Sequence, residues 1–217
     1  MQRSLKQIKQ LLGVSLAALL WVAAAKAQTQ DAELPVILAV GESTTAGFGV
    51  ARDKSWPAQL QALLDAEGWH YRVVNHGRNG ITTAMALGNL NNGLALQPRF
   101  VVIALGGNDR TMHLSREQTK ANLRRMVSIY RLTDAVVFLA DRGAATDGGQ
   151  AESASLYAEL AAEEGAVLIP SLREGLAGDA ALLIADMSHP NADGYAIIAA
   201  RMLALLTPYL RAEAAAQ

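Results

Sequence analysis

Four short blocks of the sequence carry residues whose types could do chemistry. In chain order they supply a hydroxyl nucleophile, two kinds of hydrogen-bond donor for an oxyanion, and a base beside a carboxylate. The blocks are Gly41-Glu42-Ser43-Thr44, Asn79-Gly80, Gly106-Gly107-Asn108-Asp109 and Asp186-Met187-Ser188-His189-Pro190. Each block alone could be an ordinary turn, but the four in this order indicate a serine-based active site.

Ser43 is the candidate nucleophile, because it lies two residues after Gly41, where an apolar run ends. A serine hydroxyl is a poor nucleophile until a base takes its proton, so we expect Ser43 at an exposed tight turn near a base. The alternative is that Ser43 and Thr44 only cap the segment that follows. The G-x-S-x-G elbow of the α/β-hydrolases is not met, since Thr45 occupies its last position.

His189 is the candidate base, with Asp186 three residues before it. At that spacing the carboxylate could accept from one ring nitrogen while the other nitrogen faces Ser43. Such a pair holds the imidazole in the tautomer that accepts the serine proton. The alternative is that Asp186 or Ser188 caps the last helix and that His189 is a surface residue.

The other three histidines are weaker candidates. His76 is a rival base at the end of the second apolar run, but no carboxylate lies within several residues of it. We expect His113 near the cleft, where it could contact substrate, and His70 at a structural turn.

Asn108 and Gly80 are candidate oxyanion donors. Fixed N–H donors stabilise the oxyanion that forms on a carbonyl, and each is worth on the order of 10² to 10³ in rate. Asn108 follows two glycines, and Gly80 can offer its N–H without a Cβ in the way. Asn-Gly is also a common turn dipeptide, so this block is weak by itself.

Together the four blocks resemble those of the SGNH hydrolases, the G-D-S-L esterase/lipase family. The resemblance implies that Ser43, Asp186 and His189 form a catalytic triad. It also implies an oxyanion hole made by Gly80, Asn108 and the N–H of Ser43. The likeness covers essentially the whole chain after the leader, and it is closest to the small periplasmic thioesterase/lysophospholipase/arylesterase branch.

The resemblance implies a serine esterase that hydrolyses acyl or aryl esters of small molecules, and also thioesters or lysophospholipids, through an acyl-serine intermediate. No metal or organic cofactor is required for this chemistry. Two departures from G-D-S-L are Glu42 in place of Asp and Thr44 in place of Leu. Two alternatives therefore stay open: a carbohydrate O-acetylesterase of envelope polysaccharide, and a binding protein of the same fold whose turn is disabled.

The elements that must position these blocks alternate along the chain. Strands separated by helices predict parallel βαβ units, so we expect a three-layer α/β/α sandwich around a five-stranded parallel sheet in the flavodoxin-like order 2-1-3-4-5. The first three blocks would then lie at the carboxyl ends of strands, where such sheets bind ligands. Apolar runs predict strands over 35–40, 71–75, 100–105, 135–140 and 166–169, and helical spacing predicts helices over 56–67, 82–92, 115–131, 151–164 and 191–210.

The first 27 residues have the pattern of a secretory signal peptide. A positive segment with Arg3, Lys6 and Lys9 precedes an apolar stretch, and Ala25-Lys26-Ala27 fits a cleavage site. The alternative is an uncleaved anchor, but the apolar stretch has about 15 residues where a spanning helix needs roughly 20. We therefore expect cleavage after Ala27, one domain over residues 28–217, a periplasmic or secreted location and no stable membrane insertion.

Composition excludes several classes of protein. Four of the 19 basic residues and none of the 20 acidic residues lie in the leader, so the rest of the chain carries a net charge of about −5. That charge provides no basic surface for nucleic acid. The chain has no cysteine, so it uses neither disulfides nor thiol chemistry.

Overall fold

A computed structural model describes residues 34–141, 150–176 and 178–216. Residues 35–217 form one compact unit. The expected signal peptide lies outside the described residues.

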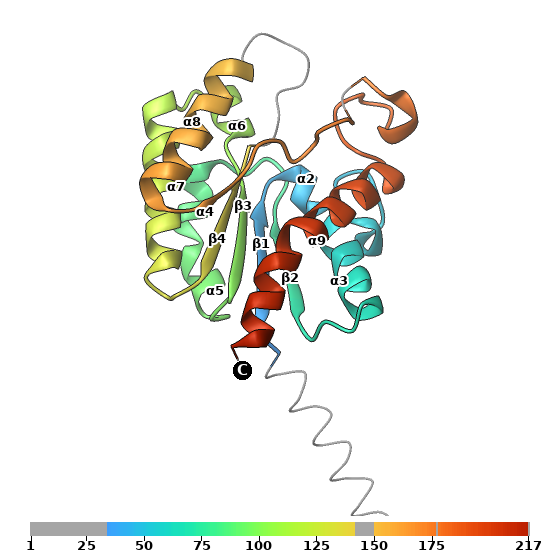
Figure 1. Cartoon of the computed structure of the whole chain (residues 1–217). Coiled ribbons are helices and arrows are strands. Elements are labelled where there is room, and N and C mark those ends of the chain that lie inside the picture. The colour runs from blue at the N-terminus through green and yellow to red at the C-terminus, as the bar shows by residue number, and fades with distance from the viewer. Residues whose placement is uncertain (1–33, 142–149, 177, 217) are drawn as a thin grey trace, which may run out of the picture. The chain divides into compact units, whose positions relative to one another are not determined.

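The unit is built on a five-stranded parallel sheet in the order β2-β1-β3-β4-β5 (Figure 1). The central strands are apolar throughout and buried on both faces, as parallel strands covered by helices must be. The strands are β1 (Val36–Gly41), β2 (Arg72–Gly77), β3 (Phe100–Ala104), β4 (Val136–Ala140) and β5 (Val167–Ile169). The predicted strands and their order are therefore confirmed, with ends shifted by one or two residues.

Helices cover both faces of this sheet and give the predicted three layers (Figure 1). One face packs against α3 (Trp56–Ala66) and α9 (Ala192–Ala215), around the buried Trp56 and Tyr195. The other face packs against α4 (Thr83–Gly88), α5 (Leu90–Leu94), α7 (Arg116–Arg131) and α8 (Gln150–Glu164). Ser115 caps α7 through a full capping box with Gln118.

Three predictions about helices need correction. The single helix expected over residues 82–92 is two helices, because the backbone leaves helical geometry at Asn89 between α4 and α5. The last helix runs on to Ala215 rather than to about Leu210. Two short helices, α2 (Ser43–Ala46) and α6 (Gly107–Thr111), were not expected, and each begins directly after a strand at the carboxyl edge.

The apolar segment after β5 packs inward, because Leu172 and Leu176 belong to the buried core. Among the described residues, every helix is too short or too polar to cross a bilayer.

Candidate active site

Ser43 lies at the first turn of α2, immediately beyond the end of β1. The turn is tight because two glycines let the backbone close up. A Cβ at Gly41 would collide with the side chain of Thr45, which is completely buried, and a Cβ at Gly77 would collide with the backbone of Ala46. The turn is tight, as expected, but Ser43 is half-buried between the buried Glu42 and Thr44 rather than exposed.

The structure brings Ser43, His189 and Asp186 together. The Ser43 Oγ lies 2.8 Å from the His189 Nε2, although the two residues are 146 positions apart. The His189 Nδ1 lies 2.6 Å from the Asp186 Oδ2. In a hydroxyl, an imidazole and a carboxylate linked in this order, the imidazole can take the hydroxyl proton while the carboxylate stabilises the imidazolium that forms.

Asp186 is held in its ionised form by its own loop. Burial alone would raise the pKa of this carboxyl, but hydrogen bonds from the backbone N–H groups of His189 and Ser188 and from the His189 ring outweigh burial and lower the pKa to about 2. Both backbone donors bind the Oδ1 at 2.9 Å, so the Oδ2 remains for the ring. The carboxylate therefore stays charged throughout the pH range in which a histidine titrates.

The loop that carries Asp186 and His189 is fixed at both ends. The Ile184 N–H donates to the His189 carbonyl at 2.9 Å, and the Arg173 guanidinium donates to the Ser188 carbonyl at 2.5 Å. The residue that caps α9 is Asn191, whose side chain accepts from the N–H groups of residues 193 and 194. Capping of the last helix by Asp186 or Ser188, the alternative considered above, does not occur.

An aromatic ring packs on the candidate base. The centroid of the Phe48 ring lies 4.7 Å from that of His189, with the rings tilted by 49°. The Phe48 carbonyl in turn accepts from the Tyr195 hydroxyl of α9 at 3.1 Å. Sequence inspection did not single out Phe48, because only the folded chain places it against His189.

Glu42, the first departure from G-D-S-L, organises the third block. Its side chain is 2% exposed, and the Oε1 accepts from the backbone N–H groups of Gly106 and Gly107 at 2.6 Å each and from Asn108 at 3.3 Å. Those N–H groups belong to the first turn of α6, where the orphan donors and the helix dipole favour a negative charge. The longer acid thus links the turn of Ser43 directly to the segment that carries Asn108.

Asn108, in the third block, is hydrogen-bonded to a residue of the first block and to the residue that follows the second block. Its backbone N–H binds Glu42, the neighbour of Ser43, and its Nδ2 donates to the carbonyl of Ile81, the neighbour of Gly80, at 2.9 Å. The amide group has two hydrogens, so one remains for a ligand. Among the described residues no hydrogen bond engages the Gly80 N–H, and space is open on the side where a Cβ would lie.

Asp109 is a structural residue of this site that sequence reasoning did not assign. The carboxylate is 1% exposed and accepts from the Thr83 N–H, the Thr83 hydroxyl and, at 2.8 Å, the Thr119 hydroxyl. It therefore ties α6 to α4 and α7. The sequence feature that could have indicated this role is the position of Asp109 directly after Asn108 in the third block.

Among the described residues, none of the other three histidines hydrogen-bonds to the triad. His76 lines a cavity beside β2, and burial lowers its pKa. His113 is exposed after α6, with a left-handed backbone at φ 60°, and His70 is exposed at the turn before β2. Among the described residues no group of three or more His, Asp or Glu side chains could hold a metal ion.

Comparison with known proteins gives a consistent result. The model of the GDSL-like lipase/acylhydrolase family matches residues 39–197. The chain is 37% identical to the esterase TesA of Pseudomonas aeruginosa over 166 residues, which are 75% of this chain and 83% of that protein. It is 30% identical to thioesterase 1/protease 1/lysophospholipase L1 of Escherichia coli K12 over 178 residues, which are 79% and 83% of the two chains.

The fold has the same relatives. The crystal structure of TesA superimposes with a TM-score of 0.73 at 33% identity, over 80% of this chain and 98% of that one. Both the sequence and the architecture therefore match along nearly the whole described unit.

Proposed function

The chain belongs to the GDSL-like lipase/acylhydrolase family and is a serine ester hydrolase, and on this premise we propose that Ser43, His189 and Asp186 are its catalytic triad. The observation that carries the proposal is the short contact between the Ser43 Oγ and the His189 Nε2, at 2.8 Å. Ser43 begins α2 and His189 lies in the loop before α9, 146 positions away in the sequence, so only the folded chain brings them together.

In the acylation step the His189 Nε2 takes the Ser43 proton while the Oγ forms a bond to the carbonyl carbon of the ester. The Asp186 carboxylate keeps the proton on the Nδ1 and stabilises the imidazolium that results. The tetrahedral intermediate collapses when the bond to the alcohol or thiol breaks, and His189 returns its proton to that leaving group. His189 then takes a proton from a water whose oxygen attacks the acyl carbon. The bond from that carbon to the Ser43 Oγ breaks, His189 returns the proton to the Oγ, and the acid is released.

We assign the oxyanion hole to the N–H of Ser43, the N–H of Gly80 and the Asn108 Nδ2. Ser43 lies at the N-terminus of a helix, where the N–H groups have no partner within the helix. The link of Asn108 to the neighbours of both Ser43 and Gly80 supports placing all three donors around one oxygen.

Apolar acyl or aryl esters are the substrate class that we favour. Phe48 is 41% exposed while its ring packs on His189, and Met187, between Asp186 and His189, is 53% exposed. Exposed apolar side chains beside a reacting centre favour an apolar ligand over a polysaccharide. A clear preference for acetylated polysaccharide over p-nitrophenyl esters from acetate to palmitate would instead favour the O-acetylesterase.

A fluorophosphonate probe tests the nucleophile. The wild-type protein should gain one covalent label, located on Ser43 by mass spectrometry, and Ser43→Ala should lose both the label and ester turnover. Ser171→Ala, a partly exposed serine elsewhere in the same unit, is the matched control and should keep both. Turnover that persists in Ser43→Ala would exclude this mechanism.

We also propose that residues 1–27 direct export and are removed, leaving residues 28–217 as the periplasmic or secreted enzyme. The charged start, the apolar stretch and the Ala25-Lys26-Ala27 site support this assignment. Amino-terminal sequencing of the protein from an osmotic-shock fraction should begin at Gln28. A cytoplasmic protein that begins at Met1 would contradict it.

A further inference from the structure

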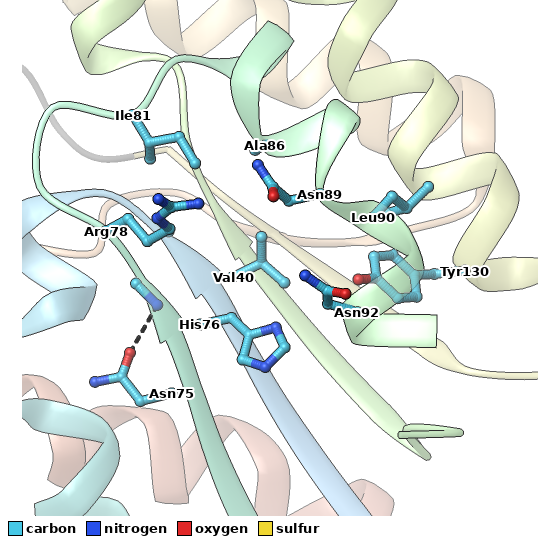
Figure 2. A pocket seen from close by; sticks show the side chains of 12 residues that line it. Val40, Asn75, His76, Arg78, Ile81, Ala86, Asn89, Leu90, Asn92 and Tyr130 are labelled. Carbon is cyan, nitrogen blue, oxygen red and sulfur yellow. Dashed lines mark hydrogen bonds between the residues drawn. The ribbon is translucent and has the colours of Figure 1, made fainter. Parts of the chain in front are cut away.

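A cavity of about 290 Å³ lies beside the active-site loops and contains none of the triad residues. It opens between the carboxyl ends of β1 and β2 on one side and α4, α5 and α7 on the other (Figure 2). Its volume is close to the lower end of small-molecule sites, roughly 300 Å³. Its floor is apolar, formed by Val40, Ile81, Ala86 and Leu90.

Tyr130 is a largely buried residue whose hydroxyl lines this cavity. The residue is 1% exposed, its hydroxyl points into the space shown in Figure 2, and no hydrogen bond of the described residues engages that hydroxyl. Burial raises the pKa of Tyr130 to about 12, so the group is a donor at neutral pH. A phenol hydroxyl that lines a cavity and has no partner in the protein can donate to an acceptor held inside it.

Among the described residues that line the cavity, Arg78 alone carries a formal charge and none is Asp or Glu. The ion pairs among the described residues do not include Arg78. A guanidinium is always charged and is suited to bind a carboxylate through two parallel hydrogen bonds. The cavity therefore has an electrostatic preference for an anion.

The other polar groups of the lining are neutral. Burial lowers the pKa of His76, so its imidazole is uncharged at neutral pH, and Asn89 and Asn92 contribute carboxamides. One cation above an apolar floor compensates one negative charge. That balance favours a singly charged organic anion over inorganic phosphate.

We propose that this cavity is a second binding site, for a small organic carboxylate that carries another oxygen. The carboxylate binds Arg78, the short apolar body covers the floor, and the second oxygen accepts from the Tyr130 hydroxyl. The site lies next to Gly80, two residues beyond Arg78, but it uses neither the triad nor the proposed oxyanion donors.

Titration of the ¹⁵N-labelled protein with 4-hydroxybutyrate tests the site. Amide shifts should concentrate at the lining residues of β2 and α4, and Arg78→Gln should weaken the Kd at least about tenfold, as expected for loss of a charge-assisted contact. Arg72→Gln removes an exposed arginine at the start of β2, the strand that Arg78 follows, outside the cavity lining, and should leave the Kd unchanged. Spectral dispersion of each variant verifies that it is folded.

Two analogues separate the roles of Arg78 and Tyr130. Tyr130→Phe should weaken the binding of 4-hydroxybutyrate several-fold but leave the Kd of butyrate, which lacks the hydroxyl, unchanged. The neutral 4-hydroxybutyramide should bind weakly and should not respond to Arg78→Gln. Equal affinity for the acid and its amide, stronger binding of inorganic phosphate, or shifts confined to another surface would each overturn the proposal.

Discussion

At the scale of single residues, Asp186 is set up to stay charged while His189 gains and loses a proton. Two backbone N–H groups and the His189 ring bind the two oxygens of one carboxylate. Partial burial raises the pKa of the Asp186 carboxyl, but these hydrogen bonds outweigh burial and lower the pKa from its usual 3.8 to about 2. The carboxylate can therefore fix the histidine tautomer at every pH at which the base itself is neutral.

We expect Asp186→Asn to lower kcat by about 10³ to 10⁴, the scale found when the orienting carboxylate of a serine triad becomes an amide. The amide would present an N–H to the Nδ1 of His189 and so favour the wrong tautomer. Steady-state hydrolysis of p-nitrophenyl butyrate at pH 8 measures this loss. A variant with wild-type kcat would remove Asp186 from the triad.

The same variant gives a stability control with a defined sign. Because the folded pKa of Asp186 is depressed, its contribution to stability is present above about pH 4 and is lost as the pH falls through about 2. The difference in unfolding free energy between wild type and Asp186→Asn should therefore shrink over that interval, measured by urea unfolding. A constant difference would show that the carboxylate charge contributes no stability.

Glu42 is the second residue whose charge has a structural purpose. Its Oε1 is the shared acceptor of three backbone donors at the start of α6. Glu42→Ala should lower the unfolding free energy by roughly 3 kcal/mol, since buried N–H groups lose a charged partner. Glu42→Gln retains an oxygen for the same donors, so its unfolding free energy should lie between those of the wild type and Glu42→Ala. A stable Ala variant would contradict this account.

At the scale of elements, the short helices α2 and α6 convert strand ends into a site. The helix α2 begins two residues after β1 ends, and α6 begins three residues after β3 ends, so Ser43 and Asn108 lie at the carboxyl edge of the sheet. Sequence patterns located both strand ends but not the helices. Four- and five-residue helices are too short to produce an apolar period, and tertiary hydrogen bonds such as those of Glu42 and Asp109 hold them.

Close contact between β2 and α2 gives a prediction at this scale. A Cβ at Gly77 would overlap the backbone of Ala46, which cannot move aside as a side-chain tip would, so Gly77→Ala should destabilise the protein by about 1–3 kcal/mol. Gly88→Ala, in the last turn of α4 with open space around it, is the matched control and should be neutral or stabilising by up to about 1 kcal/mol. Thermal unfolding of both variants checks this, and an unchanged Tm for Gly77→Ala would refute the overlap.

The break of the predicted helix over residues 82–92 shows where a local pattern gives the wrong element. Apolar positions at Met85, Leu87 and Leu90 fit one helix, yet Met85 is 49% exposed and Leu90 is buried. The chain turns at Asn89, so that Leu90 packs into the core. Periodicity cannot detect such a turn, since both halves remain helical.

At the scale of the whole molecule, the family match and the site both fall within residues 35–217. Every residue that we assign to the triad or the oxyanion hole lies between β1 and the start of α9. Protein that begins at Gln28 should therefore match the full chain in kcat/KM within about twofold and in Tm within about 2 °C. These margins correspond to about 0.5 kcal/mol, the usual effect of a change outside the core and the active site. Loss of activity on removal of residues 1–27 would show that the leader contributes to the enzyme.

The sequence by itself determined the order of strands and helices, the parallel sheet and the identity of the polar blocks. These follow from local quantities: apolar periodicity, glycine after strands, and the residue types that acyl transfer requires. Only the tertiary structure decided that Ser43 touches His189, that Glu42 binds the start of α6 and that Phe48 covers the base. Those contacts join segments up to 146 positions apart, and their distances depend on how helices pack on the sheet, which no local pattern encodes.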